Sequence, residues 1–409
     1  MIPVHAVLRS AAPILSAVCL LYGAALGRVT EVALAQQEQQ EQPATTAAEN
    51  TPQESGKPDE PAAGGAAQPG AQSAQRAPAA KAHVALILPI KSPGLGRLAE
   101  AVRLGATAAA AADGDETSLA LVTYPTGDDV REIVSAYEAA LRQGARLVIG
   151  PLAKPAVHAL AKSGAVSVPT LALSVPDADL PPPANLYFFG LPLEAEARQV
   201  AQLAQSQGRR RAAILVMDNA LSRRLAQSFT DEWTRAGRQI VGQHMFTSEA
   251  AQLRKIRDAM AAANADMIFF ALDAQRARQV RPYLGKTLAT YATSQVHAPA
   301  NDVVGQHDLN GLVFVDMPWL LVPDHPAVLG YRRPSTAFPA TDQDRFYALG
   351  IDAWRLGQAL LGDGLDAAGS IDGVTGDISL GPGHQFRREP VAAQFVQGVP
   401  RLIGPAAGR

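Results

Sequence analysis

The C-terminal part of the chain contains one long helical pattern, Asp344-Arg345-Phe346-Tyr347-Ala348-Leu349-Gly350-Ile351-Asp352-Ala353-Trp354-Arg355-Leu356. Apolar residues occur on most sides of it, which is typical of a buried helix. A glycine-punctuated strand pair follows, Gly373-Val374-Thr375-Gly376-Asp377-Ile378-Ser379-Leu380 and then Phe386-Arg387-Arg388-Glu389-Pro390. We therefore predict that segment 341–398 is a buried helix and a hairpin that close a larger α/β body.

Upstream of this stretch, short apolar strands alternate with helical patterns. The first strand, Val84-Ala85-Leu86-Ile87-Leu88-Pro89, is apolar throughout, as expected of a strand that is buried on both faces. Strands separated by helices of about 10–15 residues predict right-handed crossovers and parallel sheets. Further strands are expected at 118–123, 146–150, 168–173, 212–216, 240–246, 267–271, 287–293 and 312–315.

The two series of strands predict two lobes of one kind. The predicted fold class is α/β, with two doubly wound parallel-sheet lobes joined by three crossings. Lobe 1 would comprise about 83–188 and 336–362, and lobe 2 about 190–318 and 373–396. The folded body as a whole would span 83–404.

The first 82 residues differ in composition from this body. Arg9, the apolar run 11–27 and the sequence Ala33-Leu34-Ala35 form the three parts of a secretory signal. We expect a signal peptide at 1–35, with an uncleaved membrane anchor as the alternative. Segment 36–82 contains no Val, Ile, Leu, Met, Phe, Tyr or Trp and is rich in Ala, Gln and Pro, which predicts a disordered tether.

Cys19 raises the alternative of lipidation. A lipoprotein signal needs a small residue before the cysteine at the end of the apolar run. Here Val18 precedes Cys19 and the apolar run continues through Leu20 and Leu21. The expected localisation is therefore periplasmic after export, and outer-membrane lipid anchoring stays open with a poor lipobox at Cys19.

Composition argues against several functions. The net charge is −2, so the chain has no basic field for nucleic acid. One cysteine excludes an intramolecular disulfide and a cysteine metal cluster. The sequence has no G-x-S-x-G elbow, no P-loop and no His-Glu-x-x-His pair. We predict a non-enzyme without a metal or cofactor.

The predicted interlobe cleft is where a small-molecule ligand would bind, because ligands of open α/β sheets bind beyond the carboxyl ends of the strands. Hydroxyl and acidic side chains there could hold the carboxylate and ammonium groups of an amino acid, although each could instead be a helix cap or a loop residue. Gly150-Pro151-Leu152 offers an apolar side chain and a proline without a donor. The ligand-cleft candidates are Ser92, Tyr124, Leu152, Ser174, Phe189, Asp218, Asp273 and Asp316.

Two further motifs have alternative interpretations. Gly94-Leu95-Gly96-Arg97-Leu98-Ala99 fits a dinucleotide fingerprint, but Lys91-Ser92-Pro93 separates it from the strand and no acidic residue ends the next strand. A loop at the cleft edge is the favoured interpretation. Arg387 and Arg388 could clamp a carboxylate or phosphate, or form a solvated hairpin face.

The helix and hairpin resemble the C-terminal domain of the penicillin-binding protein activator family (LpoA/LppC type). The segments Val84–Pro89, at the start of the body, and Leu147–Leu152 match its pattern as well, so the resemblance covers about 83–404. The signature residues are Arg345, Tyr347, Gly350, Asp352, Trp354, Gly373, Gly376 and Arg388.

This resemblance implies a type I periplasmic-binding-protein-like fold. It also implies a non-catalytic periplasmic regulator that binds and activates a bifunctional penicillin-binding protein, a peptidoglycan synthase. The alternative is a solute-binding protein of an amino-acid- or amide-type ABC transporter or sensor, whose closing hairpin has a similar glycine pattern. Long members of the family carry a helical-repeat domain before this body, where the present chain has segment 36–82.

Overall fold

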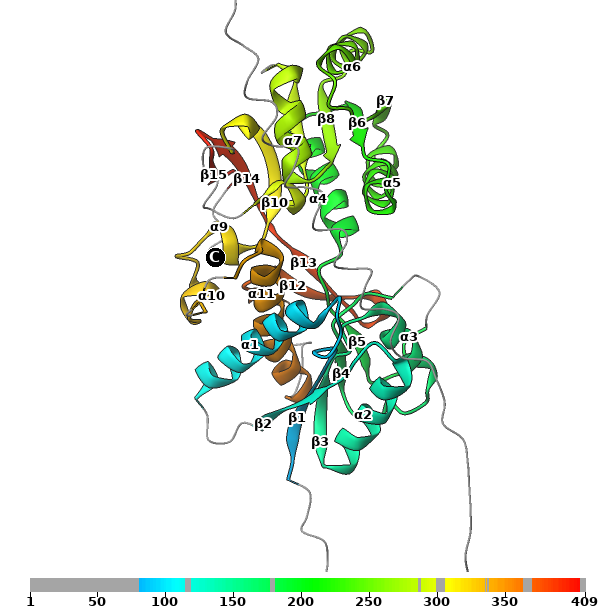
Figure 1. Ribbon diagram of the computed structural model, residues 1–409, viewed down its shortest axis with the longest axis vertical. Coiled ribbons are helices and arrows are strands. Elements are labelled where there is room, and N and C mark those ends of the chain that lie inside the picture. The colour runs from blue at the N-terminus through cyan, green and yellow to red at the C-terminus, as the bar shows by residue number, and fades with distance from the viewer. Residues whose placement is uncertain are drawn as a thin grey trace, which may run out of the picture. The chain divides into compact units, whose positions relative to one another are not determined.

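The computed structural model describes residues 81–114, 119–176, 181–285, 288–298, 306–334, 336, 338–362 and 370–404. All of them belong to one compact unit, Gln75–Arg409. The predicted signal peptide, Cys19 and all but the last two residues of the predicted tether lie outside the described residues. Within the described part the chain forms two sheets with helices on both faces (Figure 1).

The first lobe, lobe A, is built on a sheet with the strand order β11-β12-β13-β5-β4-β3-β1-β2. Strands β1 to β5 run parallel, whereas β11, β12 and β13 form antiparallel hairpins at one edge. The strands are β1 His83–Leu88, β2 Ala120–Pro125, β3 Ala145–Ile149, β4 Thr170–Ala172, β5 Leu186–Phe188, β11 Ile371–Gly373, β12 Gly376–Gly381 and β13 Gln385–Glu389.

Helices cover both faces of this sheet. They are α1 Gly96–Asp113, α2 Val130–Arg142, α3 Lys154–Lys162 and α11 Thr341–Leu361. Val84 and Leu86 of β1 pack in the core with α1 and α11, while Ala85 and Ile87 pack with α2 and α3. Every residue of β1 is buried, which confirms the prediction of a strand buried on both faces.

The second lobe, lobe B, has the strand order β15-β14-β10-β9-β8-β6-β7. Strands β6 to β10 are parallel, and β14 and β15 add an antiparallel hairpin. The strands are β6 Arg211–Val216, β7 Gln239–Met245, β8 Met267–Ala271, β9 Ala289–Ala292, β10 Leu312–Asp316, β14 Val391–Val396 and β15 Val399–Leu402.

The longer helices of lobe B are also divided between two faces. The core on one face holds α4 and α5, and that on the other holds α6 and α7. Short helices lie in the connections. The helices are α4 Leu193–Ser206, α5 Ala220–Arg235, α6 Ala250–Ala262, α7 Ala274–Val280, α9 Pro318–Leu321, α10 Pro326–Leu329 and the 3₁₀ turns η1 Arg281–Leu284, η2 Ser294–Val296, η4 His307–Leu309 and η5 Pro382–His384.

Along the described residues the chain crosses between the lobes three times, as predicted: between β5 and α4, between β10 and α11, and between β13 and β14. The two parallel-dominated sheets confirm the predicted α/β fold class.

The assignment of the C-terminal hairpin to the second lobe is wrong. Strands β12 and β13 belong to lobe A, where Gln385 of β13 pairs with Phe188 of β5. Only β14 and β15 join lobe B. The third crossing is therefore at Pro390 instead of between residues 362 and 373. Proline has no N–H to continue a ladder, so the strand breaks there and resumes on the other sheet.

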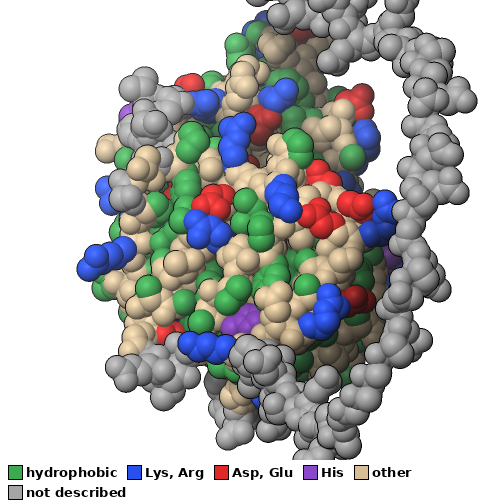
Figure 2. All heavy atoms as spheres, turned by 60° about the horizontal axis from the view of Figure 1, so that its bottom comes forward, with side chains coloured by type: hydrophobic (Ala, Val, Ile, Leu, Met, Phe, Trp, Pro, Cys, Tyr) green, Lys and Arg blue, Asp and Glu red, His purple; other side chains and the backbone are tan. Residues whose placement is uncertain are grey.

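Helix α11 confirms the prediction of burial. Its buried residues include Arg345, Asp352 and Trp354, and it packs along α1, which lies far from it in sequence (Figure 1). Across the described ranges we find no helix with both the length and the apolar character that a membrane span requires. The face shown in Figure 2 mixes basic, acidic and hydrophobic side chains, in keeping with the small net charge.

Candidate functional site

Three of the polar ligand-cleft candidates, Ser92, Asp218 and Asp273, have local partners. The Ser92 hydroxyl accepts a hydrogen bond from Leu95 N at 2.9 Å, at the start of α1. Asp273 is the N-cap of α7 and forms an ion pair within its first turn. Asp218 is exposed and pairs with Arg223 at 2.7 Å. These contacts fit the alternative of caps and loop residues.

Two of the remaining candidates are apolar core residues. Leu152 and Phe189 are buried beside α1 and α11, and the ring of Phe189 meets that of Phe386 edge-on, with 6.5 Å between the ring centroids. Apolar side chains thus occupy positions where a solute-binding site would need polar groups. Ser174 is partly buried just after β4.

Tyr124 does not face the carboxyl ends of the strands. Its hydroxyl lies 2.9 Å from His83 Nε2 and donates to Gln143 at 3.1 Å. His83 is the first residue of β1 and Gln143 caps the end of α2, so both contacts lie at the opposite edge of the sheet. Whether any of the eight candidates contacts a ligand stays a prediction.

Asp316 is the candidate that enters a buried charged cluster. It ends β10, is 1% exposed, and forms an ion pair with Arg345 of α11 at 2.7 Å. Nδ1 of His297 lies 2.8 Å from the same carboxylate. Burial alone would raise the pKa of Asp316, but the Arg345 guanidinium and the His297 contact hold that pKa well below its usual range. The Asp316–Arg345 ion pair therefore joins lobe B to lobe A in the charged state.

A second ion pair joins the lobes nearby. Glu196 of α4 and Arg388 of β13 are in direct contact, with side chains that are 3% and 4% exposed. Arg388 also donates to the Thr375 carbonyl at 3.3 Å. Ser294 connects the two pairs, because its N–H donates to Glu196 at 3.0 Å and its carbonyl accepts from Arg345 at 3.0 Å.

Asp352 of α11 holds the turn between β11 and β12. Its carboxylate accepts hydrogen bonds from Val374 N at 3.0 Å, Thr375 N at 2.8 Å and the Thr375 hydroxyl at 2.7 Å. Burial raises the pKa of Asp352, and the Arg355 guanidinium and these hydrogen bonds oppose that rise. Thr375 thereby connects Asp352 to Arg388.

We define the interlobe network as Asp316, Arg345, Ser294, Glu196, Arg388, Thr375 and Asp352. Three of these are signature residues and Asp316 is a cleft candidate, but Glu196, Ser294 and Thr375 were not among the predicted site residues. Glu196 lies on the buried face of α4, together with Ala197 and Val200. A carboxylate among apolar residues at helical spacing is the signal that could have identified it. Because its charges are buried and mutually paired, the network is suited to fixing the lobes.

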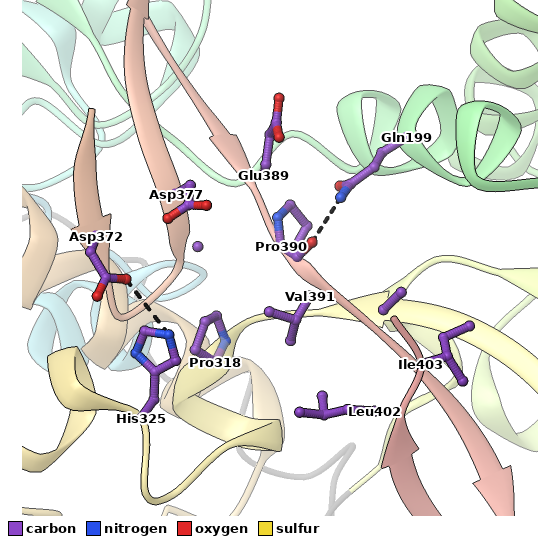
Figure 3. A pocket seen from close by; sticks show the side chains of 12 residues that line it. Gln199, Pro318, His325, Asp372, Asp377, Glu389, Pro390, Val391, Leu402 and Ile403 are labelled. Atoms are coloured by element: carbon purple, nitrogen blue, oxygen red, sulfur yellow. Dashed lines mark hydrogen bonds and ion pairs between the residues drawn. The ribbon is translucent and has the colours of Figure 1, made fainter. Parts of the chain in front are cut away.

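A cavity of about 160 Å³ lies beside Pro390 at the third crossing (Figure 3). Its lining combines carboxylates and apolar side chains from both lobes: Gln199, Pro318, His325, Asp372, Gly376, Asp377, Glu389, Pro390, Val391, Ala392, Leu402 and Ile403. Among the described residues no cluster of three or more His, Cys, Asp or Glu side chains could hold a metal ion.

A comparison with models of known protein families identifies the family of this chain. Residues 31–261 and 256–398 match the family model described as "LppC putative lipoprotein". The chain belongs to the LppC family. The predicted resemblance is thus confirmed, and the matched residues include the helix α11 and most of the C-terminal hairpins.

Named relatives in the LppC family are penicillin-binding protein activators. The activator LpoA of Yersinia pseudotuberculosis serotype O:1b (strain IP 31758) is 27% identical over 309 residues, which cover 64% of this chain and 46% of that protein. LpoA of Haemophilus ducreyi (strain 35000HP / ATCC 700724) is 24% identical over 265 residues, which cover 63% and 45%. The chain thus spans about half the length of these curated relatives.

Two solved structures show the same fold. The C-domain of Haemophilus influenzae LpoA, described as a regulator of PBP1A, has a TM-score of 0.65 at 20% identity and covers 79% of this chain and all of that one. A Chromobacterium violaceum ATCC 12472 structure, described as that of "a putative branched-chain amino acid ABC transporter", has a TM-score of 0.67 at 37% identity, with 77% and 100% coverage. The two descriptions name different functions.

Proposed function

We propose that the chain is a non-catalytic regulator that binds and activates a bifunctional penicillin-binding protein. The observation that carries this proposal is the family match over 31–261 and 256–398, together with relatives named as penicillin-binding protein activators. Those relatives are about twice as long as the region they share with this chain. We propose that the shared body is the part that contacts the synthase.

The site geometry supports action by protein contact. The polar cleft candidates Ser92, Asp218 and Asp273 already have partners within this chain. Leu152 and Phe189 place apolar bulk at two further candidate positions, where a polar ligand would need donors. Buried ion pairs between the lobes would also oppose the hinge motion that ligand closure requires.

The test is reconstitution with the synthase of the same organism. We expect the mature chain to bind it and to raise its rate of glycan polymerisation or peptide cross-linking from lipid-linked precursor. A solute-binding protein of the same fold serves as control and should leave both rates unchanged. Absence of binding together with unchanged rates would rule the proposal out.

A solute-binding function is the second candidate, favoured by the 37% identity to the Chromobacterium violaceum structure. A ligand at 100 times its Kd stabilises a protein by about 2.7 kcal/mol, which raises Tm by several degrees. We expect no such shift with leucine, isoleucine, valine or small amides. A saturable rise of about 5 °C with one of them would favour the second candidate.

We further propose that the protein is exported and acts in the periplasm, in keeping with the lipoprotein description of its family. Mass spectrometry of the mature N-terminus tests this. A chain beginning at Gln36 indicates a cleaved secretory signal, and a diacylated or triacylated Cys19 indicates an outer-membrane lipoprotein. An unprocessed Met1 would contradict export by signal cleavage.

A further inference from the structure

The cavity beside Pro390 is formed by both lobes. Asp372, Asp377 and Glu389 come from the edge hairpins of lobe A, while Val391 and Leu402 come from the hairpin of lobe B (Figure 3). Its volume of about 160 Å³ is well below the roughly 300–1,000 Å³ of sites for drug-sized ligands. A single long side chain suits this space better than a free small molecule.

The lobe A side of the cavity is acidic and lacks a cation. Of the twelve described residues that line it, three are carboxylates and none is Lys or Arg. Asp377 of β12 and Glu389 of β13 are directly opposite each other in the antiparallel ladder. Like charges in that relation destabilise a hairpin.

Neither carboxylate is compensated within the described structure. No hydrogen bond or ion pair joins Asp377 or Glu389 to another described side chain, whereas Asp372 has His325 at 3.6 Å. The hairpin thus maintains an unfavourable charge pair at the mouth of a cavity. A positively charged group placed between the two carboxylates would remove this repulsion.

The lobe B side of the cavity is apolar. Leu402 and Ile403 line the cavity, and Leu402 is 38% exposed. Such a wall suits the methylene chain of Lys or Arg and a neighbouring apolar residue.

Strand addition is a poor mode of binding at this edge. Strand β15 is the edge of its sheet, but Pro400 lies in it and has no N–H to donate. Recognition would therefore come from side chains that enter the cavity.

We propose that this cavity receives one Lys or Arg side chain from a segment of the partner protein, with the charged group between Asp377 and Glu389 and the methylene chain against Leu402 and Ile403. The assignment of the partner as the synthase rests on the function proposed above. Since the wall comes from both lobes, the bound side chain contacts lobe A and lobe B at their third crossing.

The test removes the two charges without changing side-chain shape. The variant Asp377→Asn/Glu389→Gln is compared with Glu138→Gln/Asp258→Asn, which removes the same charge from exposed positions on α2 and α6. Binding of the full mature chain to the synthase is measured at low and moderate salt. We expect the first variant to weaken Kd about tenfold and to flatten its salt dependence, and the control to stay within about twofold.

Folding and binding are separated by the melting temperature. Because the first variant removes a repulsion, its Tm should equal or exceed that of the wild type while its affinity falls. Wild-type affinity would overturn the proposal at any Tm, as would a fall in affinity accompanied by a lower Tm, because the loss would then come from a damaged fold.

A titration with a small probe molecule distinguishes failure of this proposal from failure of the proposed function. If the wild type does not bind the synthase, the proposed function fails, and the cavity is judged with N-acetyl-L-arginine amide. Saturable NMR shifts at Gly376 and Val391, lost in Asp377→Asn/Glu389→Gln but kept in the control, support the cavity. Identical shifts in wild type and variant, or none in the wild type, overturn it.

Discussion

Arg387 and Arg388 are neighbours in β13, yet their side chains have opposite environments. Arg387 is exposed, whereas the Arg388 side chain is 4% exposed and contacts Glu196 across the lobes. Successive side chains of a strand point to opposite faces, so one position in register decides which arginine is buried. Arg388 does clamp a carboxylate, but that carboxylate belongs to Glu196 of the same chain. Arg387 fits the alternative interpretation, a solvated hairpin face.

Replacing Arg388 should therefore cost much more than replacing Arg387. Arg388→Met leaves the buried Glu196 carboxylate without its cation, and we expect a loss of about 3–5 kcal/mol in unfolding free energy. Arg387→Met is the matched control and should change it by less than about 0.5 kcal/mol. Urea denaturation measures both. Equal losses in the two variants would mean that the buried pair has no special role.

The contribution of Asp316 should depend on pH. Its pKa in the folded protein lies below the unfolded value of about 3.9, so the unfolded state binds the proton first as pH falls. The stabilisation is complete at neutral pH and is lost progressively below about pH 5.

This dependence is measured as the difference in unfolding free energy between wild type and Asp316→Asn. We expect up to about 3–5 kcal/mol at pH 7, because the variant removes the buried counter-charge of Arg345 and leaves only its ion pair with the exposed Asp342. The difference should shrink on titration toward pH 3.5. Asp218→Asn is the exposed control and should give less than about 0.5 kcal/mol throughout. A difference that is constant with pH would contradict the charged pair.

At the scale of elements, local patterns predicted the strands and helices well but not all of their partners. The continuous apolar run of β1 and the apolar surface of α11 predict burial directly, because the hydrophobicity of each residue indicates whether that residue is buried. The placement of β12 and β13 depends on one pairing, Gln385 with Phe188, between residues far apart in the chain. No local property of either residue encodes that pairing. Pro390 was the available clue, since it interrupts an otherwise continuous strand pattern.

The same limit applies to the candidate site. Asp316 was chosen because it follows a strand, and that rule also selected Asp218 and Asp273, which proved to have local partners. What distinguishes Asp316 is Arg345, a residue on another element. Burial of a charge and the identity of its partner are tertiary properties that strand ends do not reveal.

Helices α1 and α11 approach closely enough that glycine is needed at their contact. A β-carbon on Gly350 would overlap the Val102 carbonyl oxygen, and one on Gly105 would overlap that of Tyr347. Two opposing effects bear on Gly350→Ala: alanine favours a helix interior by about 0.5–1 kcal/mol, and overpacking a core costs about 1–3 kcal/mol.

We expect the overpacking to dominate in Gly350→Ala, because the obstructing atoms belong to the backbone and can move only with the helix. Unfolding free energy should fall by about 1–2 kcal/mol. Gly94→Ala is the control, since no atom lies within 4 Å of its β-carbon position. Stabilisation of the Gly350 variant in thermal or urea denaturation would show that the helices can separate.

For the whole molecule, the interlobe network predicts one arrangement of the two lobes. Separating the lobes would break the buried Asp316–Arg345 and Glu196–Arg388 ion pairs, at a cost of several kcal/mol. A regulator that acts by surface contact benefits from fixed lobes, because its binding surface is then formed before the partner arrives. A solute-binding protein instead needs lobes that open and close.

Interlobe distance distributions test this prediction. Spin labels are placed at Glu138→Cys on α2 and Asp258→Cys on α6, in a chain that starts at Gln36 and so lacks the sole native cysteine. We expect one narrow distribution that does not change with leucine. Glu196→Gln removes one buried charge and leaves Arg388 unpaired, so it should broaden the distribution. Two wild-type populations, or a shortening of the distance on adding leucine, would contradict fixed lobes and favour a hinged binding protein.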